Sequence, residues 1–278
     1  MTSKQSAGAA AFRALHHRDG AFIIPNPWDA GSARLLASLG FEALATTSAG
    51  FAFSLGMPEG RLAPDAVLAH CRTIVEATDL PVSADLEKGF GDSPESVAET
   101  IRAAAATGLA GGSIEDHTNR RDDPIFDFTL AVERIAAAAE AARALPHDFV
   151  LTARCENFLW DRPDLDDTIR RLQAFEAAGA DVLYAPGLRS LEDIRRLCGA
   201  VGKPVNVVMG LPGACFSVHQ LAYAGVKRIS VGSALARLAY GACLRAVQDI
   251  AAQGRFDGLS GAVGFAEFEE RFAAFQPD

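Results

Sequence analysis

The sequence has no paired cysteines, no basic tract and no long apolar segment. Its 5 Cys residues form no Cys-x-x-Cys pair, and an odd, dispersed set of thiols is typical of reduced cysteines in a cytoplasmic protein. No apolar run reaches the length of a membrane span, and residues 1–20 read as an amphipathic segment rather than a signal peptide. The 26 Lys and Arg against 35 Asp and Glu give a net charge of −9, which argues against a nucleic-acid partner. We therefore expect a cytoplasmic protein that binds neither nucleic acid nor membrane.

What the sequence does contain is a regular alternation of short β-branched runs and Ala-rich amphipathic segments. Eight such pairs follow one another at roughly 30 residues per unit, the size of a βα repeat in a closed parallel barrel. No Gly-x-Gly-x-x-Gly follows the first apolar run, which argues against a dinucleotide-binding sheet. The pattern predicts an α/β fold, a single (β/α)8 TIM-type barrel over residues 1–278. The predicted strands are Ala21–Pro25, Ala43–Thr47, Pro81–Asp85, Gly111–Glu115, Phe149–Arg154, Ala180–Tyr184, Pro204–Val208 and Arg228–Val231. The predicted helices are Ala30–Leu39, Pro64–Thr78, Pro94–Thr107, Thr129–Ala144, Leu165–Ala178, Leu191–Gly199, Ser217–Ala224 and Ala234–Gln253.

Two further helical segments lie outside the eight units. Ser3–His17 precedes the first strand and is predicted to cover the N-terminal end of the barrel. Phe265–Phe275 places its Phe residues along one helical stripe, after a glycine-rich loop. The C-terminal segment 254–278 can therefore pack on its own barrel or on a partner subunit, and both interpretations stay open.

Three acidic residues stand where apolar runs end. Asp85 and Glu87 follow one run and Glu115 ends the next. Residues i and i+2 of a strand share a face, so Asp85 and Glu87 are predicted to point the same way. If the two strands are parallel neighbours, all three acids meet at one end of the sheet. Such acids can be helix N-caps, but their convergence favours a cation site, and a set of oxygen ligands without His or Cys favours Mg²⁺ or Mn²⁺.

Polar residues also end the other predicted strands, where barrel enzymes carry their chemistry. Arg154 lies among acids, and an arginine so placed either clamps a substrate carboxylate or forms a structural ion pair. His117 is a candidate acid or base or else a solvated loop residue, and alternation turns Cys155 towards the helix layer. Gly232-Ser233 either holds a phosphate or makes the turn into the last helix. A run of small residues can hold an anion: Thr47, Ser48, Ala49 and Gly50. Three polar side chains complete the candidates: Thr152, Glu156 and Asn206.

Several segments resemble, in order and spacing, those of the isocitrate lyase/phosphoenolpyruvate mutase superfamily. The resemblance covers nearly the whole chain. It implies a (β/α)8 enzyme that binds Mg²⁺ and cleaves or forms C–C or P–C bonds beside an α-keto or enol carboxylate. It also implies a homotetramer, a dimer of dimers that swap their C-terminal helices. The matching segments are 25–30, 47–50, 55–59, 85–91, 114–116, 153–154, 178–181 and 204–206.

The resemblance assigns roles to individual residues of this chain. Asp85 corresponds to the direct metal ligand, and Glu87, Glu115 and Glu59 correspond to ligands that act mostly through water. Relatives commonly have Asp where this chain has Glu59 and Glu87. The remaining roles are a site for a substrate carboxylate or phosphonyl oxygen at Ser48–Gly50, a charged clamp at Arg154, a polar wall at Asn206 and a structural motif at Trp28-Asp29.

The chain departs from the superfamily lyases after its fourth strand. Those enzymes carry a mobile Lys-Lys-Cys-Gly-His loop whose Cys is the acid/base, whereas residues 116–124 here contain neither Cys nor Lys. Arg120 or Arg121 can stabilise developing charge, but a guanidinium stays protonated and cannot act as a general base. Cleavage by the Cys-dependent route is not expected, and reactions that need metal polarisation and charge stabilisation remain open.

The leading hypothesis is a Mg²⁺-dependent (or Mn²⁺-dependent) carbon–carbon lyase or decarboxylase that acts on a small α-keto or 2-hydroxy di- or tricarboxylate. In this hypothesis Arg154 orients the acid, and Arg120, Arg121 or His117 closes over the site from loop 116–128. A phosphonomutase or phosphonopyruvate hydrolase is the alternative, with Asn119 beside Arg120 as its weak signal. A non-catalytic carboxylate-binding relative and, on Gly232-Ser233 alone, a sugar-phosphate isomerase also stay open.

Overall fold

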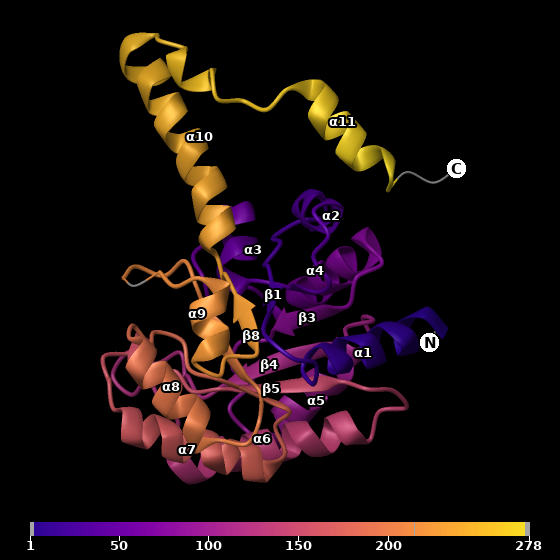
Figure 1. Ribbon diagram of the computed structural model, residues 1–278, viewed down its shortest axis with the longest axis vertical. Helices are drawn as coiled ribbons and strands as arrows, with labels where there is room; N and C mark the ends of the chain where they lie inside the picture. Colours follow the sequence, from indigo (N-terminus) through magenta and orange to yellow (C-terminus); the bar gives the residue numbers. More distant parts are fainter. Residues whose placement is uncertain (1–2, 214, 276–278) are drawn as a thin grey trace.

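Eight parallel strands form a nearly closed barrel surrounded by helices (Figure 1). The computed structural model describes residues 3–213 and 215–275. Neighbouring strands pair in the order β1-β8-β7-β6-β5-β4-β3-β2, and the amide of Ala45 donates to the carbonyl of Pro25 at 3.0 Å where β1 approaches β2. The predicted (β/α)8 barrel is confirmed. The strands are β1 (Phe22–Ile24), β2 (Leu44–Ala45), β3 (Val82–Asp85), β4 (Gly111–Glu115), β5 (Val150–Arg154), β6 (Val182–Tyr184), β7 (Val205–Val208) and β8 (Arg228–Ser230).

The helices begin where the sequence supplies capping side chains. Asp29 forms a capping box with Ser32, which confirms the structural role predicted for Asp29. One helix, α3, is absent from the sequence prediction: Thr47 caps it immediately after β2, so Ser48 begins a helix instead of ending a strand. No helix in the described part of the chain is long and apolar enough to cross a membrane. The helices are α1 (Ser3–Leu15), α2 (Ala30–Ser38), α3 (Ser48–Ser54), α4 (Pro64–Ala77), α5 (Pro94–Ala105), α6 (Phe128–Arg143), α7 (Leu165–Ala178), α8 (Leu191–Ala200), α9 (Val218–Tyr223), α10 (Ala234–Gln253) and α11 (Phe265–Ala273), with short 3₁₀ turns η1 (Asn157–Leu159) and η2 (Asp257–Leu259).

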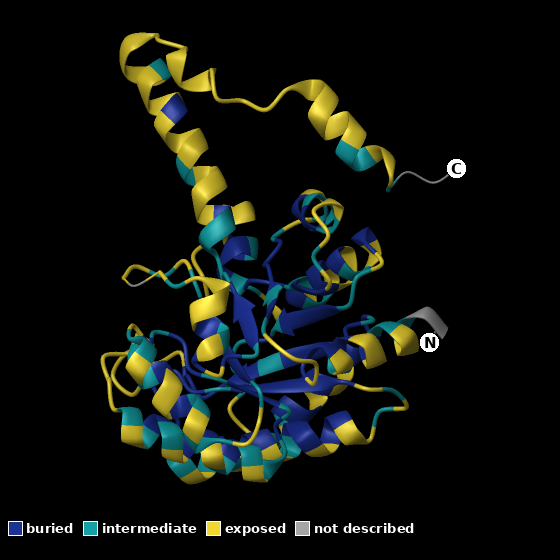
Figure 2. Cartoon of the chain, in the orientation of Figure 1, coloured by how far each residue is buried: buried dark blue, intermediate teal, exposed yellow. Residues whose placement is uncertain are grey.

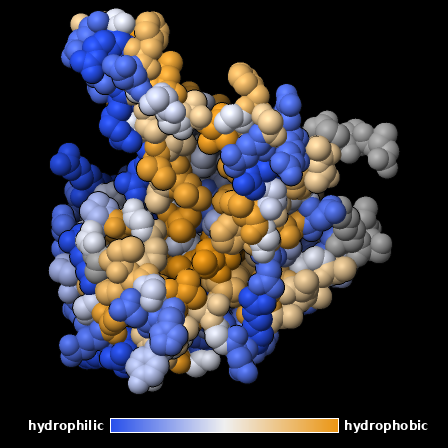
Figure 3. All heavy atoms as spheres, turned by 45° about the horizontal axis from the view of Figure 1, so that its top comes forward, coloured by the Kyte–Doolittle hydropathy of each residue, from blue (hydrophilic) through white to orange (hydrophobic). Residues whose placement is uncertain are grey.

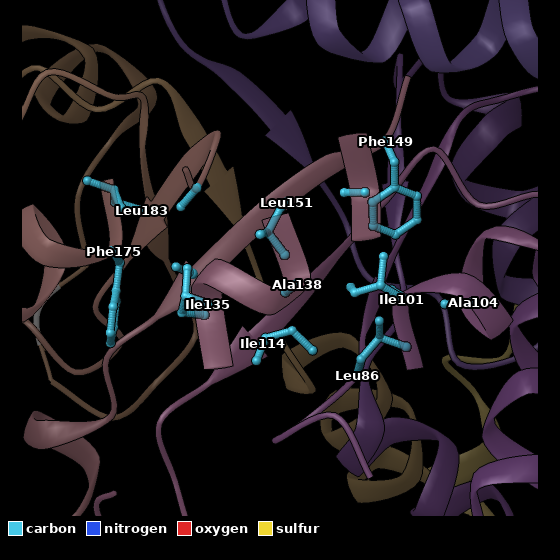
Figure 4. Close-up of a cluster of buried hydrophobic side chains, with 14 of the residues drawn as sticks. Leu86, Ile101, Ala104, Ile114, Ile135, Ala138, Phe149, Leu151, Phe175 and Leu183 are labelled. Carbon is cyan, nitrogen blue, oxygen red and sulfur yellow. The ribbon is translucent and has the colours of Figure 1, made fainter. Parts of the chain in front are cut away.

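Apolar side chains fill two layers of the barrel. The larger cluster lies between strands and helices and includes Leu86 and Ile114 (Figure 4). The smaller cluster joins Phe12 of α1 to Phe22 and Val150, which are the first residues of β1 and β5. Helix α1 therefore covers the N-terminal end of the barrel, as predicted, and the opposite end is left for chemistry.

Helix α10 and the segment after it form an arm that projects from the barrel (Figure 1) and is exposed along most of its length (Figure 2). Helix α11 has no buried residue, and Phe265 is 89% exposed. Leu244 on α10 and Phe256 after it are also exposed, and apolar surface gathers where the arm meets the body (Figure 3). The helix predicted at Phe265–Phe275 is present, and its packing on a partner subunit stays a prediction.

Candidate active site

Charged side chains gather at the C-terminal ends of three neighbouring strands. Asp85, Glu115 and Arg154 are the last residues of β3, β4 and β5, and Glu115 pairs with Arg154 across the ladder. Because the strands are parallel, these residues share one end of the barrel, as predicted. They line two adjoining cavities that have Arg154 in common. The inner cavity, about 60 Å³, is lined mainly by strand residues, and the outer cavity, about 420 Å³, mainly by loop residues.

Ser48 brings Asp85 and Glu59 together. Its hydroxyl oxygen lies 2.8 Å from Asp85 Oδ2 and 2.7 Å from Glu59 Oε1. A hydroxyl has one hydrogen, so it can donate to only one of these carboxylates at a time. Burial, together with the charge of Asp85, raises the pKa of Glu59. Two carboxylates on one hydroxyl need a proton or a cation between them.

Glu87 lies beyond the end of β3 in a left-handed backbone conformation, with φ 49°. The direction of the Glu87 side chain was predicted from strand alternation, and that premise is wrong because β3 ends at Asp85. Beyond the strand, the amide of Glu87 donates to Asp85 Oδ1 at 3.3 Å. The turn still brings Glu87 to the outer cavity, where burial and then the charges of Asp85 and Glu115 raise its pKa to about 7. Non-glycine residues held at positive φ are strained positions of the kind found at functional sites.

Arg154 is an ion-pair partner in this structure. Its Nη1 lies 3.3 Å from Glu115 Oε2 and 3.7 Å from Asp85 Oδ1, and its Nε pairs with Glu156. The guanidinium also packs over the ring of Tyr184, 5.1 Å from its centroid. Burial opposes the charge, yet the surrounding acids raise the pKa of Arg154 well above its usual value. Of the two roles open for Arg154, the ion pair is observed, so a substrate would share the guanidinium with these acids.

His117 stacks on Trp160 at the wall of the outer cavity. The ring centroids are 3.8 Å apart at 15°, and Trp160 Nε1 donates to Glu156 Oε2 at 3.2 Å. His117 Nδ1 lies 3.7 Å from Glu115 Oε1, whereas its buried Nε2 has no hydrogen-bond partner among the residues that the structure describes. His117 lines the outer cavity, and an imidazole held there can exchange a proton with a bound molecule. Nothing in the sequence assigned Trp160 this supporting position.

The segment in place of the lyase loop folds into a hairpin, closed by an antiparallel bridge at His117. Arg120 Nη1 pairs with Asp92 at 3.0 Å, and Arg121 is exposed. The residues lining the two cavities include neither arginine, so the structure does not bring Arg120 and Arg121 to the acids. Asn119, at φ 63°, does line the outer cavity.

The small residues predicted to hold an anion form the start of α3. The amide of Gly50 donates to Thr47 Oγ1 at 3.2 Å, and that of Ser48 lies 3.4 Å from Asp85 Oδ2. These two amides already have partners within the protein. Gly50 is also needed for close packing, since a Cβ there would lie 2.5 Å from Thr47 Cγ2 and 3.3 Å from Ala236 of α10. Ser48 keeps its hydroxyl on the outer cavity.

Two residues predicted at the rim, Thr152 and Asn206, lie in the barrel interior. Thr152 Oγ1 and Asn206 Oδ1 both accept hydrogen bonds from Arg228, each at 2.9 Å. Asn206 Nδ2 donates to Ser230 Oγ at 3.1 Å. Arg228 is a residue that the sequence did not single out. Gly232, at φ 52°, makes the turn that leads into α10, which supports the turn interpretation of this segment.

The oxygen donors at this site suit a hard divalent cation. They are the carboxylates of Asp85, Glu59, Glu87 and Glu115 and the hydroxyl of Ser48. Over residues 3–213 and 215–275, no three His, Cys, Asp or Glu side chains are close enough to hold an ion by themselves. Mg²⁺ usually keeps several waters and takes one or two protein carboxylates, so it would need few of these side chains directly.

Fold and site together place this chain among the (β/α)8 proteins with an acidic site at the C-terminal ends of their strands. The family model described as phosphoenolpyruvate phosphomutase matches residues 12–251, and the chain belongs to this family and to the isocitrate lyase/phosphoenolpyruvate mutase superfamily. The predicted superfamily is confirmed.

Named relatives include lyases, a mutase and a hydrolase. The chain is 32% identical to 2-methylisocitrate lyase of Escherichia coli over 203 residues, which cover 70% of this chain and 67% of the relative. A crystal structure of a Burkholderia cenocepacia protein described as a lyase/mutase has 59% identity and a TM-score of 0.96, covering 100% of this chain and 99% of that chain. Oxaloacetate acetylhydrolase in complex with oxalate has 27% identity and a TM-score of 0.85, with 97% and 95% covered.

Proposed function

We propose that this protein is a divalent-metal-dependent carbon–carbon lyase, decarboxylation included, that acts on a small α-keto or 2-hydroxy di- or tricarboxylate. The observation that carries the proposal is the convergence of carboxylates, one arginine and one imidazole on a single cavity. The names of two relatives, 2-methylisocitrate lyase and oxaloacetate acetylhydrolase, refer to substrates of this class.

In this proposal Asp85 would hold the cation directly, and Glu59, Glu87 and Glu115 would hold it through water. When bound, Mg²⁺ or Mn²⁺ draws electron density from the substrate oxygens and stabilises negative charge that develops during cleavage. Arg154 places a second positive charge on the same cavity. Its pairing with Glu115 and Glu156 fixes its position before substrate arrives.

His117 is the residue best placed to move the proton. Cleavage of a 2-hydroxy acid removes the hydroxyl proton, turns the alcohol carbon into a carbonyl and leaves the electron pair of the broken C–C bond on the departing fragment as an enolate. The imidazole of His117, which lines the outer cavity, takes that proton and returns it to the enolate carbon. The stack on Trp160 holds the ring in place for both transfers.

A phosphonomutase or phosphonopyruvate hydrolase is a second candidate, favoured by Asn119. This residue lines the outer cavity at positive φ, and its side chain hydrogen-bonds to Glu87. In that reaction a phosphoryl group leaves carbon for oxygen at the same site. Phosphorus NMR of phosphonopyruvate incubated with the protein distinguishes the candidates, because only P–C cleavage changes the phosphorus signal.

The test of the lyase is release of pyruvate or glyoxylate from a panel of keto and hydroxy di- and tricarboxylates. We expect turnover that EDTA abolishes and added MgCl₂ restores. Asp85→Asn should remove it, whereas the exposed Asp65→Asn should not. Turnover that is indifferent to EDTA would contradict the metal-dependent mechanism.

The proposal extends to assembly as a homotetramer built from dimers that exchange residues 254–278. The exposed apolar side chains of the arm, among them Leu244, Phe256 and Phe265, support it. Surface of this kind is costly to leave in water, and packing on a second copy would cover it.

A further inference from the structure

Arg228, the first residue of β8, is a buried cation without a carboxylate beside it. It is 5% exposed, and no ion pair of the described residues includes it. Its Nε donates to Asn206 and one Nη2 hydrogen to Thr152, while Nη1 lies 3.5 Å from His16 Nε2. These partners are neutral. Burial lowers the pKa of Arg228 to about 10, which still leaves it charged at neutral pH.

Arg134, a second buried arginine, is held by backbone carbonyls and an aromatic ring, although its Nε has no hydrogen-bond partner among the described residues. Its guanidinium donates to the backbone carbonyls of Gly91 at 2.8 Å and Asp92 at 2.6 Å, and it lies 4.2 Å from the centroid of the Phe126 ring. Arg228 has no such cage. A guanidinium carries five N–H donors, so two of those on Arg228 are left after Asn206, Thr152 and His16 are served.

The space next to Arg228 is the inner cavity. Arg154, Tyr184, Asn206 and Arg228 are paired in succession across β5, β6, β7 and β8, so their side chains share the interior face of the barrel. All four line the cavity together with Ser230, and the carboxylate of Asp85 lines it as well. Its volume of about 60 Å³ is enough for a few waters or one carboxylate group.

The two arginines of this cavity differ in charge balance. Arg154 is paired with Asp85, Glu115 and Glu156, whereas Arg228 has no acid within ion-pair distance in the described chain. A buried charge that lacks a partner is strongly destabilising, and an anion in the cavity would supply that partner.

We propose that the inner cavity is an anion subsite in which Arg228 binds a carboxylate-sized anion. Two sources share this chemistry: a second carboxylate of the substrate, or a free small anion such as formate. The first source rests on the proposed function, and the second does not.

The subsite itself is tested without metal or substrate. Sodium formate replaces a bulky sulfonate buffer salt at constant ionic strength, and Tm is measured for the wild type, Arg228→Gln, Arg228→Lys and the exposed control Arg72→Gln. At roughly ten times its dissociation constant, formate should raise the Tm of the wild type and of Arg72→Gln by about 3 °C. Arg228→Gln should lose this rise, and Arg228→Lys should keep part of it. An equal rise in Arg228→Gln would overturn the inference.

A second measurement needs no variant, so it holds even if Arg228→Gln does not fold. Crystals of the unmodified protein soaked in bromide should show an anomalous peak beside the guanidinium of Arg228. If bromide fully occupies other sites on the protein and gives no anomalous peak at Arg228, the proposed subsite is overturned.

The two sources are separated by calorimetry with Mg²⁺ present. Malate and lactate are both 2-hydroxy acids and differ by one carboxylate. If the substrate supplies the anion, the wild type should prefer malate about 10- to 100-fold, and Arg228→Gln should lose that preference while it still binds oxalate. If the formate effect is present and the malate preference is unchanged in Arg228→Gln, the anion is a free ion. Failure of the wild type to bind oxalate with Mg²⁺ would contradict the proposed lyase and leave the formate and bromide results to decide the subsite.

Discussion

Acid is expected to weaken the fold through His16, a buried residue in the turn that follows α1. The side chain is 4% exposed, its Nδ1 donates to the carbonyl of Phe12 at 2.9 Å, and its Nε2 faces Arg228 at 3.5 Å. Protonation would place two buried cations in contact. Burial, followed by the charge of Arg228, therefore lowers the pKa of His16 from 6.5 to about 3.

The sign and size of the effect follow from linkage. The folded pKa lies below that of the unfolded chain, so the stability contributed by neutral His16 is complete above pH 6.5 and is lost as the pH falls towards 3. At pH 5 the unfolded chain binds nearly one proton that the folded chain does not. The free energy of unfolding should fall by about 2 kcal/mol from this residue alone, or about 4 °C in Tm.

Urea unfolding at pH 7 and pH 5 measures this loss. The loss of stability between the two pH values should be about 2 kcal/mol smaller in His16→Gln than in the wild type. The difference between variants in this pH-dependent loss cancels the contribution of the acids that titrate in all of them, and the exposed His219→Gln serves as the matched control. The same pH dependence in the wild type and in His16→Gln would refute the argument.

Three further outcomes follow from the site and the arm. Arg154→Gln leaves Asp85, Glu115 and Glu156 without their cation, so urea unfolding at pH 8 should show a loss of about 3–5 kcal/mol, and a loss below 1 kcal/mol would mean that water already screens these charges. His117→Gln should lower kcat by about 10²- to 10⁴-fold and leave the calorimetric affinity for oxalate with Mg²⁺ unchanged; an unchanged kcat would exclude His117 as the proton carrier. Removal of residues 254–278 should reduce the number of subunits in the oligomer, measured as its mass by light scattering, with little change in the circular dichroism of the barrel. An unchanged number of subunits would show that residues 254–278 do not join subunits.

The barrel and much of its rim could be predicted because they depend on local patterns. Parallel strands of a closed barrel end together, so Asp85, Glu115 and Arg154 had to share one end. Glu87 was harder, because a left-handed turn ends the alternation from which its direction was inferred. Helix α3 escaped prediction because β2 is only Leu44–Ala45, and Thr47 caps the next helix at once.

Other features depend on contacts between distant parts of the chain. Trp160 lies at the end of a 3₁₀ turn, stacks on His117 and donates to Glu156. Arg228 stands at the start of its strand, away from the rim, and the interior partners Asn206 and Thr152 come from two other strands. No spacing in the sequence brings these residues together.

The charges of the two cavities are unbalanced in opposite senses. The carboxylates that line the outer cavity outnumber Arg154, which favours an added cation, whereas Arg154 and Arg228 outnumber the carboxylate of Asp85 in the inner cavity, which favours an added anion. Because the cavities adjoin, a divalent cation and a dicarboxylate that enter together correct both imbalances.

We therefore expect Mg²⁺ and malate to bind cooperatively, each raising the affinity for the other by the same factor, as linkage requires. Calorimetric titration of each in the presence of the other should give a coupling of about 5-fold or more in the wild type and a smaller one in Arg228→Gln. Independent binding of the two would show that the opposite charges of the two cavities are not linked through the ligand.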